Sequence, residues 1–176
     1  MLNSSIASYN VASQILITVF MILFGINFNV FYLLLIRKAK DAFKFEELRY
    51  YLLIIAVAIG LITWNIHGMF ENVWEALHQA SFQVASIITT TGYATADYGL
   101  WPIFSQTILV VLMFIGACAG STGGGIKVSR IVILFKLVKN EISHMMHPKR
   151  VNQVRFGGHV VSKEIWRGIQ MFLFSY

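Results

Sequence analysis

Two long apolar runs, joined by a short charged segment, occupy the first part of the sequence. The first run, residues 11–36, is interrupted only by isolated polar residues such as Gln14, Asn27 and Asn29. The second run covers residues 48–66. A helix needs about 20 mostly apolar residues to cross a bilayer, so each run predicts one membrane-spanning helix.

The next segment has a different pattern of apolar and polar positions. Residues 72–88 predict an amphipathic helix, with Glu71 or Asn72 placed to begin it. Residues 89–97 open with three consecutive threonines and a glycine. These residue types disfavour a helix, so we expect an extended strand there. The helix and the strand are too short and too polar to cross the bilayer, and together they predict a re-entrant loop.

A third apolar run, residues 104–119, is followed by a glycine-rich break. Four glycines lie within residues 120–125, and each costs a helix about 1 kcal/mol relative to alanine. Such a break at membrane depth is tolerated only where protein or a water-filled cavity satisfies the freed backbone groups. The apolar pattern resumes at residues 131–138, and residues 160–176 predict the start of another span.

The composition agrees with a membrane protein. The chain has 176 residues, of which 57% are hydrophobic and 12% are charged, whereas soluble domains carry about 25% charged residues. No Lys or Arg precedes Arg37, and the first apolar run is longer than the core of a signal peptide. We therefore expect that run to remain as a span, and the predicted fold class is an all-α integral membrane protein.

The positive charges are distributed unevenly along the chain. Five Lys and Arg residues lie between Arg37 and Arg49 and nine lie from Lys127 onward, but none lies within residues 67–102. By the positive-inside rule, the re-entrant loop opens to the outside and the glycine break lies deeper, toward the cytoplasm. The alternation of charge with apolar runs argues against a nucleic-acid-binding face, although the net charge is +6.

The residues after the re-entrant helix suggest a site for a monovalent cation. Backbone carbonyls of an extended strand can replace the hydration shell of such an ion. Gly92 permits backbone angles that turn a carbonyl toward a pore axis, and Tyr93 can pack behind the strand. A threonine hydroxyl adds an oxygen ligand at the inner end. The predicted ligands of K⁺ are therefore Thr90, Thr91, Gly92 and Tyr93, although this string is also common in ordinary loops.

The glycine break admits three interpretations. It is similar in composition to a phosphate-binding loop, but it lacks the Gly-Lys-Ser/Thr ending and interrupts a membrane span. Its small residues could instead serve helix packing. The functional alternative is a flexible constriction below the cation site that gates the pore. The residues of this predicted gating loop are Gly120, Ser121, Thr122, Gly123, Gly124, Gly125 and Lys127.

Two motifs closely resemble the Trk/Ktr family of potassium transporters, and in particular the membrane subunit of the bacterial Trk systems. They are residues 88–97 (ITTTGYATAD) and residues 116–127 (GACAGSTGGGIK). Residues 25–28 (GINF) also look like that family's exit helix of the second repeat. The two motifs together, at this spacing, are specific to the family.

The resemblance implies a potassium-channel-like fold of four helix–pore loop–helix repeats around one pore. Residues 1–38 would be the exit transmembrane helix of a preceding repeat, and residues 39–47 a cytoplasmic connection. Residues 48–147 would form a complete helix–pore loop–broken helix repeat, the third. Residues 148–176 would be a cytoplasmic connection and the start of the next transmembrane helix.

The resemblance also implies partners and a location. Members of the family are multi-pass proteins of the bacterial inner membrane that form homodimers and bind cytoplasmic nucleotide-binding regulatory subunits. A pore needs four filter strands, and this chain has one. We therefore expect it to require the remaining repeats of the same transporter, and not to conduct ions alone.

A few further residues carry candidate chemistry. Cys118 lies in an apolar run, where a thiol behaves as a small hydrophobe. His144 and His147 are too few for a metal site and fit an interfacial role. Asp97 could attract cations to the outer mouth or could cap a turn. Lys127 could sense the field of the pore, but a position at the cytoplasmic interface is favoured.

The predicted function is potassium uptake through a carbonyl-lined selectivity filter. The scattered acidic residues and the absence of a nucleophile–base pair argue against an enzyme, and no cofactor is expected besides the transported potassium ion. Two alternatives stay open. One is a homotetrameric potassium channel with one pore loop per chain, and the other is a non-conducting membrane scaffold.

Overall fold

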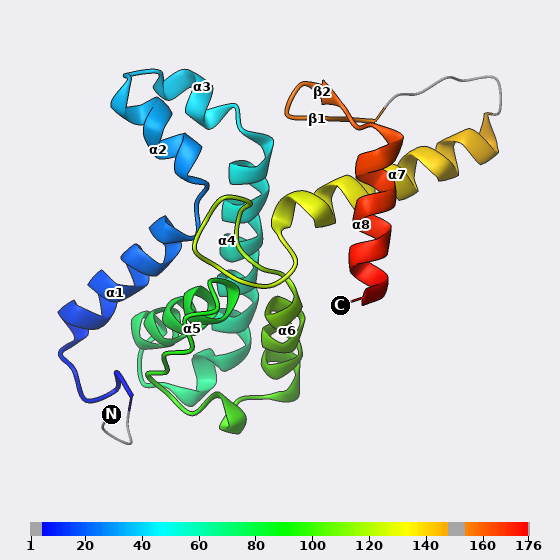
Figure 1. Cartoon of the computed structure of the whole chain (residues 1–176). Coiled ribbons are helices and arrows are strands. Elements are labelled where there is room, and N and C mark those ends of the chain that lie inside the picture. The colour runs from blue at the N-terminus through cyan, green and yellow to red at the C-terminus, as the bar shows by residue number, and fades with distance from the viewer. Residues whose placement is uncertain (1–4, 148–153, 176) are drawn as a thin grey trace.

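Helices account for nearly all of the regular structure of the chain (Figure 1). The computed structural model describes residues 5–147 and 154–175. Helices α1, α4, α5 and α6 lie together, and α7 leads away from them toward a small hairpin and α8. The elements are α1 (Val11–Phe24), α2 (Phe28–Leu35), α3 (Ala39–Phe43), α4 (Glu46–Ile66), η1 (His67–Met69), α5 (Val73–Ile88), η2 (Tyr98–Leu100), α6 (Ile103–Phe114), α7 (Val128–Met146), β1 (Arg155–Phe156), β2 (His159–Val160) and α8 (Lys163–Ser175).

Helix α4 covers the second predicted span. Among the described residues it is, together with η1, the one helix that is long and apolar enough to cross a membrane by itself. Buried side chains repeat every three or four positions along one face, while Leu53 and Trp64 on the rest of the helix are exposed, as contact with lipid requires. The buried stripe consists of Tyr51, Ile55, Ala58, Ile62 and Ile66.

Helix α5 is the predicted re-entrant helix, and it packs against α1, α4 and α6. Asn72 is its N-cap residue, in agreement with the sequence pattern. Ala76 and Ala80, one turn apart, are fully buried and allow close approach of the neighbouring helices. His78 on α5 and Gln14 on α1 are joined through Nε2 and Oε1 at 2.8 Å. This bond explains why a polar residue is accommodated inside the first apolar run.

The first apolar run does not form one continuous helix, so that prediction is wrong. Helices α1 and α2 are bent by 93° relative to each other, as Figure 1 shows. Asn27 begins α2 because its side-chain oxygen accepts a hydrogen bond from the N–H of Asn29 at 2.9 Å. Gly25 at the bend lies so close to the hydroxyl of Tyr51 that a Cβ atom there would collide with it.

The third apolar run forms a helix that is shorter than predicted. Helix α6 ends at Phe114, and residues 115–119 belong to the loop that leads to α7. The helix stops because the N–H of Gly116 bonds to the carbonyl of Ile126 at 2.7 Å, across the loop, and not to the preceding helical turn. Helix α7 then continues through the predicted residues 131–138.

The apolar segment predicted from residue 160 begins in a hairpin and not in a helix. Val160 lies in an antiparallel hairpin, in which it pairs with Arg155. Helix α8 begins only at Lys163, and its first turn carries Glu164. Thirteen residues of this helix are described, and the start of a transmembrane helix there stays a prediction. The predicted connection at 148–153 lies outside the described residues.

An ion pair attaches the hairpin to α4 and α7. Lys136 on α7 donates to the carboxylate of Glu46 at 2.9 Å and to the carbonyl of Arg155 at 2.9 Å. The same carboxylate accepts a hydrogen bond from the N–H of Gly157 at 3.0 Å. The hairpin is therefore positioned by the start of α4, on the side of the molecule away from α5 (Figure 1).

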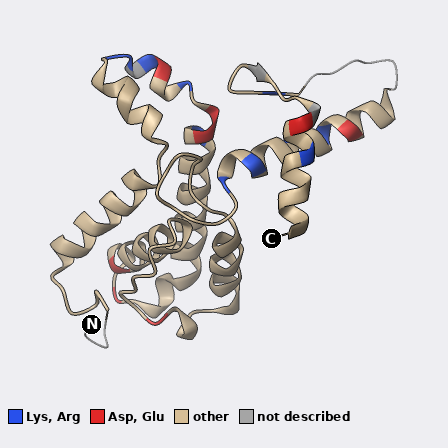
Figure 2. Ribbon diagram, viewed as in Figure 1, with Lys and Arg blue, Asp and Glu red and all other residues tan. Residues whose placement is uncertain are grey.

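Charge separates the two ends of the structure. Figure 2 shows the Lys and Arg residues around α3, α7 and α8, whereas the opposite end, with the start of α5, shows acidic residues only. Those acidic residues are Glu71, Glu75 and Asp97. The arrangement agrees with the predicted orientation, in which the end near α5 faces outward.

The close contact at the α1–α2 bend yields a stability prediction. We expect Gly25→Ala to destabilise the full-length protein by about 1–3 kcal/mol, because the added methyl group overpacks against Tyr51. Thermal unfolding of the purified protein in detergent measures the effect. Gly60→Ala is the matched control, since no atom lies within 4 Å of a Cβ at that position in α4. Equal melting temperatures for the two variants would contradict the described bend.

Candidate functional site

The C-terminus of α5 is closed by a left-handed turn at an unusual residue. The N–H of Thr90 bonds to the carbonyl of Ile87 at 3.0 Å, and the N–H of Thr91 bonds to that of Ser86 at 2.9 Å. This pair of bonds is the Schellman arrangement, which normally has glycine at the left-handed position. Here Thr90 occupies that position, with φ of 56°. A β-branched residue with positive φ is an outlier that usually marks a functional constraint.

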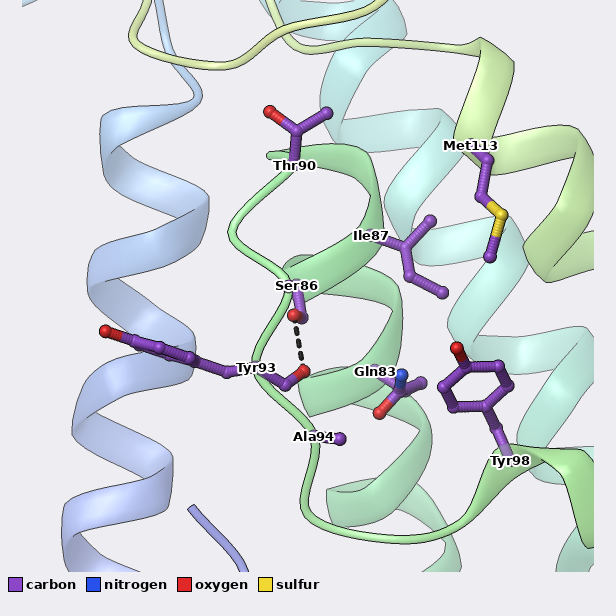
Figure 3. Close-up of a pocket in the computed structure, with 9 residues that line it drawn as sticks. Gln83, Ser86, Ile87, Thr90, Tyr93, Ala94, Tyr98 and Met113 are labelled. Atoms are coloured by element: carbon purple, nitrogen blue, oxygen red, sulfur yellow. Dashed lines mark hydrogen bonds between the residues drawn. The ribbon is translucent and has the colours of Figure 1, made fainter. Parts of the chain in front are cut away.

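The strand that follows the turn presents free carbonyl oxygens. Within the described part of the chain, no hydrogen bond ends on the carbonyls of Thr90, Thr91 or Gly92. The next carbonyl, that of Tyr93, accepts from the hydroxyl of Ser86 at 2.6 Å (Figure 3). Three of the four predicted ligands thus expose unused carbonyls, while the fourth carbonyl is held by α5.

The outer end of the strand is fixed by further polar contacts. The carbonyl of Ala94 accepts from the N–H of Ile6 at 3.2 Å. The hydroxyl of Thr95 donates to Oε1 of Gln79 on α5 at 2.5 Å. Asp97 accepts from the N–H of Gly99 at 2.9 Å, so its carboxylate caps the turn at η2. The strand is therefore anchored to α5 and to the N-terminal segment beyond the free carbonyls.

The threonine side chains have different partners. The hydroxyls of Thr89 and Thr91 lie 2.8 Å apart, and that of Thr89 donates to the carbonyl of Ala85 at 2.6 Å. The hydroxyl of Thr91 is therefore turned back toward α5. The hydroxyl of Thr90 instead accepts from the N–H of Gly124 at 2.7 Å. This contact brings the predicted cation site and the predicted gating loop together.

A cavity of about 320 Å³ lies beside the strand. The amide oxygen of Gln83, on α5, is buried there without a hydrogen-bond partner among the described residues. The ring of Tyr93 points away from Gln83 and Tyr98 (Figure 3) and is 38% exposed. The lining residues are Gln83, Ser86, Ile87, Thr90, Gly92, Tyr93, Ala94, Tyr98 and Met113.

The glycine-rich loop is closed at its base by two strand-like bonds. Ile115 and Ile126 form a parallel bridge. The N–H of Gly116 bonds to the carbonyl of Ile126 at 2.7 Å, and the N–H of Ile126 bonds to that of Phe114 at 3.1 Å. The two sides of the base approach so closely that a Cβ at Gly116 would collide with the carbonyl of Gly124. A glycine is required at this crossing for steric reasons.

The loop docks on the bend between α1 and α2. The N–H of Cys118 bonds to the carbonyl of Gly25 at 3.0 Å, and the N–H of Phe28 bonds to the carbonyl of Gly120 at 3.1 Å. The hydroxyl of Thr122 donates to the carbonyl of Phe24 at 3.2 Å. Backbone groups that the helix bend leaves free are thus satisfied by the loop, and those of the loop by the bend.

Glu47 is a site residue that the sequence analysis missed. It was assigned to the cytoplasmic connection, but its side chain is buried. Its Oε1 accepts hydrogen bonds from the N–H of Ala119 at 2.7 Å and of Ser129 at 3.2 Å. The carboxylate therefore joins the loop to the first turn of α7, where a negative charge is favoured by the helix dipole. Its position one turn before Tyr51, on the buried stripe of α4, was a usable signal.

The remaining candidates lie in different surroundings. Lys127 donates to the carbonyl of Gly123 within the loop, so the ammonium lies on the loop; the favoured position at the cytoplasmic interface stays a prediction. Cys118 is buried, as expected for a small hydrophobe. His144 and His147 are exposed, and no group of metal-binding side chains occurs among the described residues.

The chain matches one protein family over almost its whole length. The family described as "TrkH: Cation transport protein" matches residues 1–175. The Trk system potassium uptake protein TrkH of Salmonella typhimurium is 34% identical over 165 residues, which are 92% of this chain and 34% of that protein. TrkG of Escherichia coli strain K12 is 37% identical over 162 residues, 89% of this chain and 33% of that protein.

A solved structure has the same fold. The crystal structure of the potassium transporter TrkH from Vibrio parahaemolyticus superimposes with a TM-score of 0.91 at 28% sequence identity. The superposition covers 99% of this chain and 38% of that one. The chain thus spans about a third of the length of the curated relatives that it matches.

The buried carboxylate of Glu47 leads to a prediction about the loop. Glu47→Ala removes the acceptor of two partly buried N–H groups, at a cost of about 1 kcal/mol each. We expect amide hydrogen exchange within residues 115–129 of the full-length protein to accelerate at least about tenfold, measured by mass spectrometry. Glu47→Gln keeps one acceptor oxygen and should show a smaller increase. Glu71→Ala, at the exposed outer end, is the control, and equal protection in all variants would contradict the role of Glu47.

Proposed function

Because the chain belongs to the TrkH family of cation transport proteins, we propose that it forms one quarter of a potassium-selective pore together with the loop that gates it. The observation that carries the proposal is the row of three unused carbonyls at Thr90, Thr91 and Gly92, at the end of a short helix. The named relatives are potassium uptake proteins, in agreement with a function that is transport and not catalysis.

The chemistry of the strand fits a dehydrated monovalent cation. Carbonyl oxygens in a row can substitute for the water shell of K⁺. The C-terminus of α5, with its partial negative charge, lies at the inner end of the row. Gly92 has φ of 79°, a conformation that permits a change of carbonyl direction between neighbouring residues. Ser86 and Gln79 on α5 hold the outer part of the strand at Tyr93 and Thr95.

The glycine-rich loop fits the role of a constriction below the site. Its backbone reaches the inner end of the strand through Gly124 and Thr90. The ammonium of Lys127 lies on the same loop, at the carbonyl of Gly123, and places positive charge near the path of a cation. Withdrawal of the loop would remove both the backbone and the charge from that path.

The whole transporter is larger than this chain. We propose that residues 48–147 are its third repeat, and that residues 1–38 and 148–176 belong to the neighbouring repeats, with 39–47 as the cytoplasmic connection. The three other strands of the filter come from the remaining repeats. The complete protein is proposed to be a multi-pass homodimer of the bacterial inner membrane, bound to cytoplasmic nucleotide-binding regulatory subunits.

The two alternatives from the sequence have less support. A homotetrameric channel would need four copies of one chain, whereas relatives about three times as long match this chain over one third of their length. A non-conducting scaffold would use the glycines for helix packing only. The loop glycines instead lie against the base of the loop, the turn at Thr89 and Thr90, and Asn27 at the α1–α2 bend.

Substitution of the strand glycine tests the proposal. We expect Gly92→Asp, in the full-length gene, to abolish growth of uptake-deficient bacteria at low potassium. The substitution puts a side chain at φ of 79°, which costs about 1–2 kcal/mol, and adds a charge beside the row of carbonyls. Gly68→Asp is the control, because a side chain there meets no atom within 4 Å and the φ is not positive. Normal growth of the Gly92 variant, at wild-type protein levels, would refute the filter assignment.

A further inference from the structure

We propose that the hydroxyl of Thr90 is a latch that holds the gating loop against the inner end of the filter strand. The inference deepens the proposed function and rests on it. Thr90 belongs to the predicted ion ligands, but its hydroxyl serves a second purpose in the structure. It accepts the N–H of Gly124 at 2.7 Å and donates to its own neighbour, the carbonyl of Thr89, at 2.7 Å.

The latch is the direct polar link between the two functional parts. Among the described residues, the Gly124–Thr90 bond is the single hydrogen bond between residues 115–127 and the strand 90–94. The other hydrogen bonds from residues 115–127 to separate elements go to the α1–α2 bend and to Glu47. Figure 3 shows the Thr90 side chain pointing from the turn toward the loop ribbon.

The conformation of Thr90 supports a role beyond helix capping. Glycine would end α5 in the same left-handed turn without steric cost. Threonine at φ of 56° is strained, and its β-branch increases the strain. Such strain persists only where the surrounding structure holds it. Besides the two backbone bonds of the turn, the hydroxyl bonds to Thr89 and Gly124 hold this residue, and glycine has no side-chain atom to make them.

Release of the loop then has a defined effect on the cation site. Loss of the Gly124 bond frees the hydroxyl oxygen of Thr90 and removes one restraint on its left-handed backbone. The oxygen becomes available to an ion at the inner end of the strand. Gate position and inner ion site are therefore coupled through one side chain, and Thr90 acts as a positioning residue as well as a ligand.

A double cysteine variant tests the latch. A Cβ at position 124 would lie 3.7 Å from the Cβ of Thr90, within the range of about 3.5–4.5 Å found in disulfides. We expect Thr90→Cys/Gly124→Cys in the full-length transporter to form a disulfide under copper–phenanthroline. Rubidium flux into proteoliposomes should then fall about tenfold or more, and dithiothreitol should restore it. The disulfide itself is read by mass spectrometry, independently of transport.

The two single-cysteine variants are the controls. They retain the native Cys118, so they report any pairing with that thiol, and their flux should not respond to the oxidant. Failure of the disulfide to form would show that the two residues do not meet and would overturn the latch. A disulfide that leaves flux unchanged would overturn it as well. Wild-type protein without any potassium or rubidium flux would instead refute the proposed function, while the cross-linking yield still reports the contact.

A second comparison decides the matter if the reduced double variant does not transport. Thr90→Val has the shape of threonine but lacks the acceptor oxygen, whereas Thr90→Ser keeps it. Loss of one net hydrogen bond favours the released loop by about fivefold. We expect amide hydrogen exchange within residues 120–127 of the full-length protein to be about fivefold faster for Thr90→Val than for Thr90→Ser, a difference that does not depend on the hydroxyl as an ion ligand. Equal or slower exchange in the valine variant would contradict the latch.

Discussion

The structure depends on one constraint: backbone polar groups freed inside a membrane must find partners in the protein. Within residues 5–147, helical structure is interrupted at residues 25–27 and at residues 115–127. Water cannot satisfy either break in the hydrocarbon region. The two breaks therefore meet, and carbonyls of the α1–α2 bend accept from the loop while the loop accepts from the start of α2. Neither break could be satisfied in this way without the other.

This constraint also explains which parts of the fold could be predicted from the sequence and which could not. The spacing of hydrophobic residues and the lengths of the apolar runs are enough to predict helices α4 and α5. The four clustered glycines are enough to predict the break in the helix. The bend at Gly25 was not predicted, because Asn27 resembles the isolated polar residues that a continuous span tolerates. Its cause is the loop, which lies about ninety residues away in the sequence and is invisible to any local pattern.

The candidate site likewise has some features that the sequence predicts and others that depend on tertiary contacts. The free carbonyls fall on the predicted strand because threonine and glycine disfavour a helix there. The restraint of the Tyr93 carbonyl by Ser86 and the role of Glu47 both depend on tertiary contacts. A charged residue that lies on an apolar stripe, and a β-branched residue where a turn favours glycine, are conflicts between local preference and fold. Such conflicts tend to mark functional positions, and both occur around this loop.

The parallel bridge between Ile115 and Ile126 has a mechanical consequence. Helix α7 starts directly after this bridge and extends for nineteen residues, or about 28 Å at 1.5 Å per residue. The helix is rigid on the scale of its length, and its near end is bonded to the base of the loop. A tilt imposed at the far end of α7 would therefore rotate the helix about the Ile115–Ile126 bridge and move the base of the loop with it. A displacement at that end would therefore be transmitted to the base of the loop through the helix.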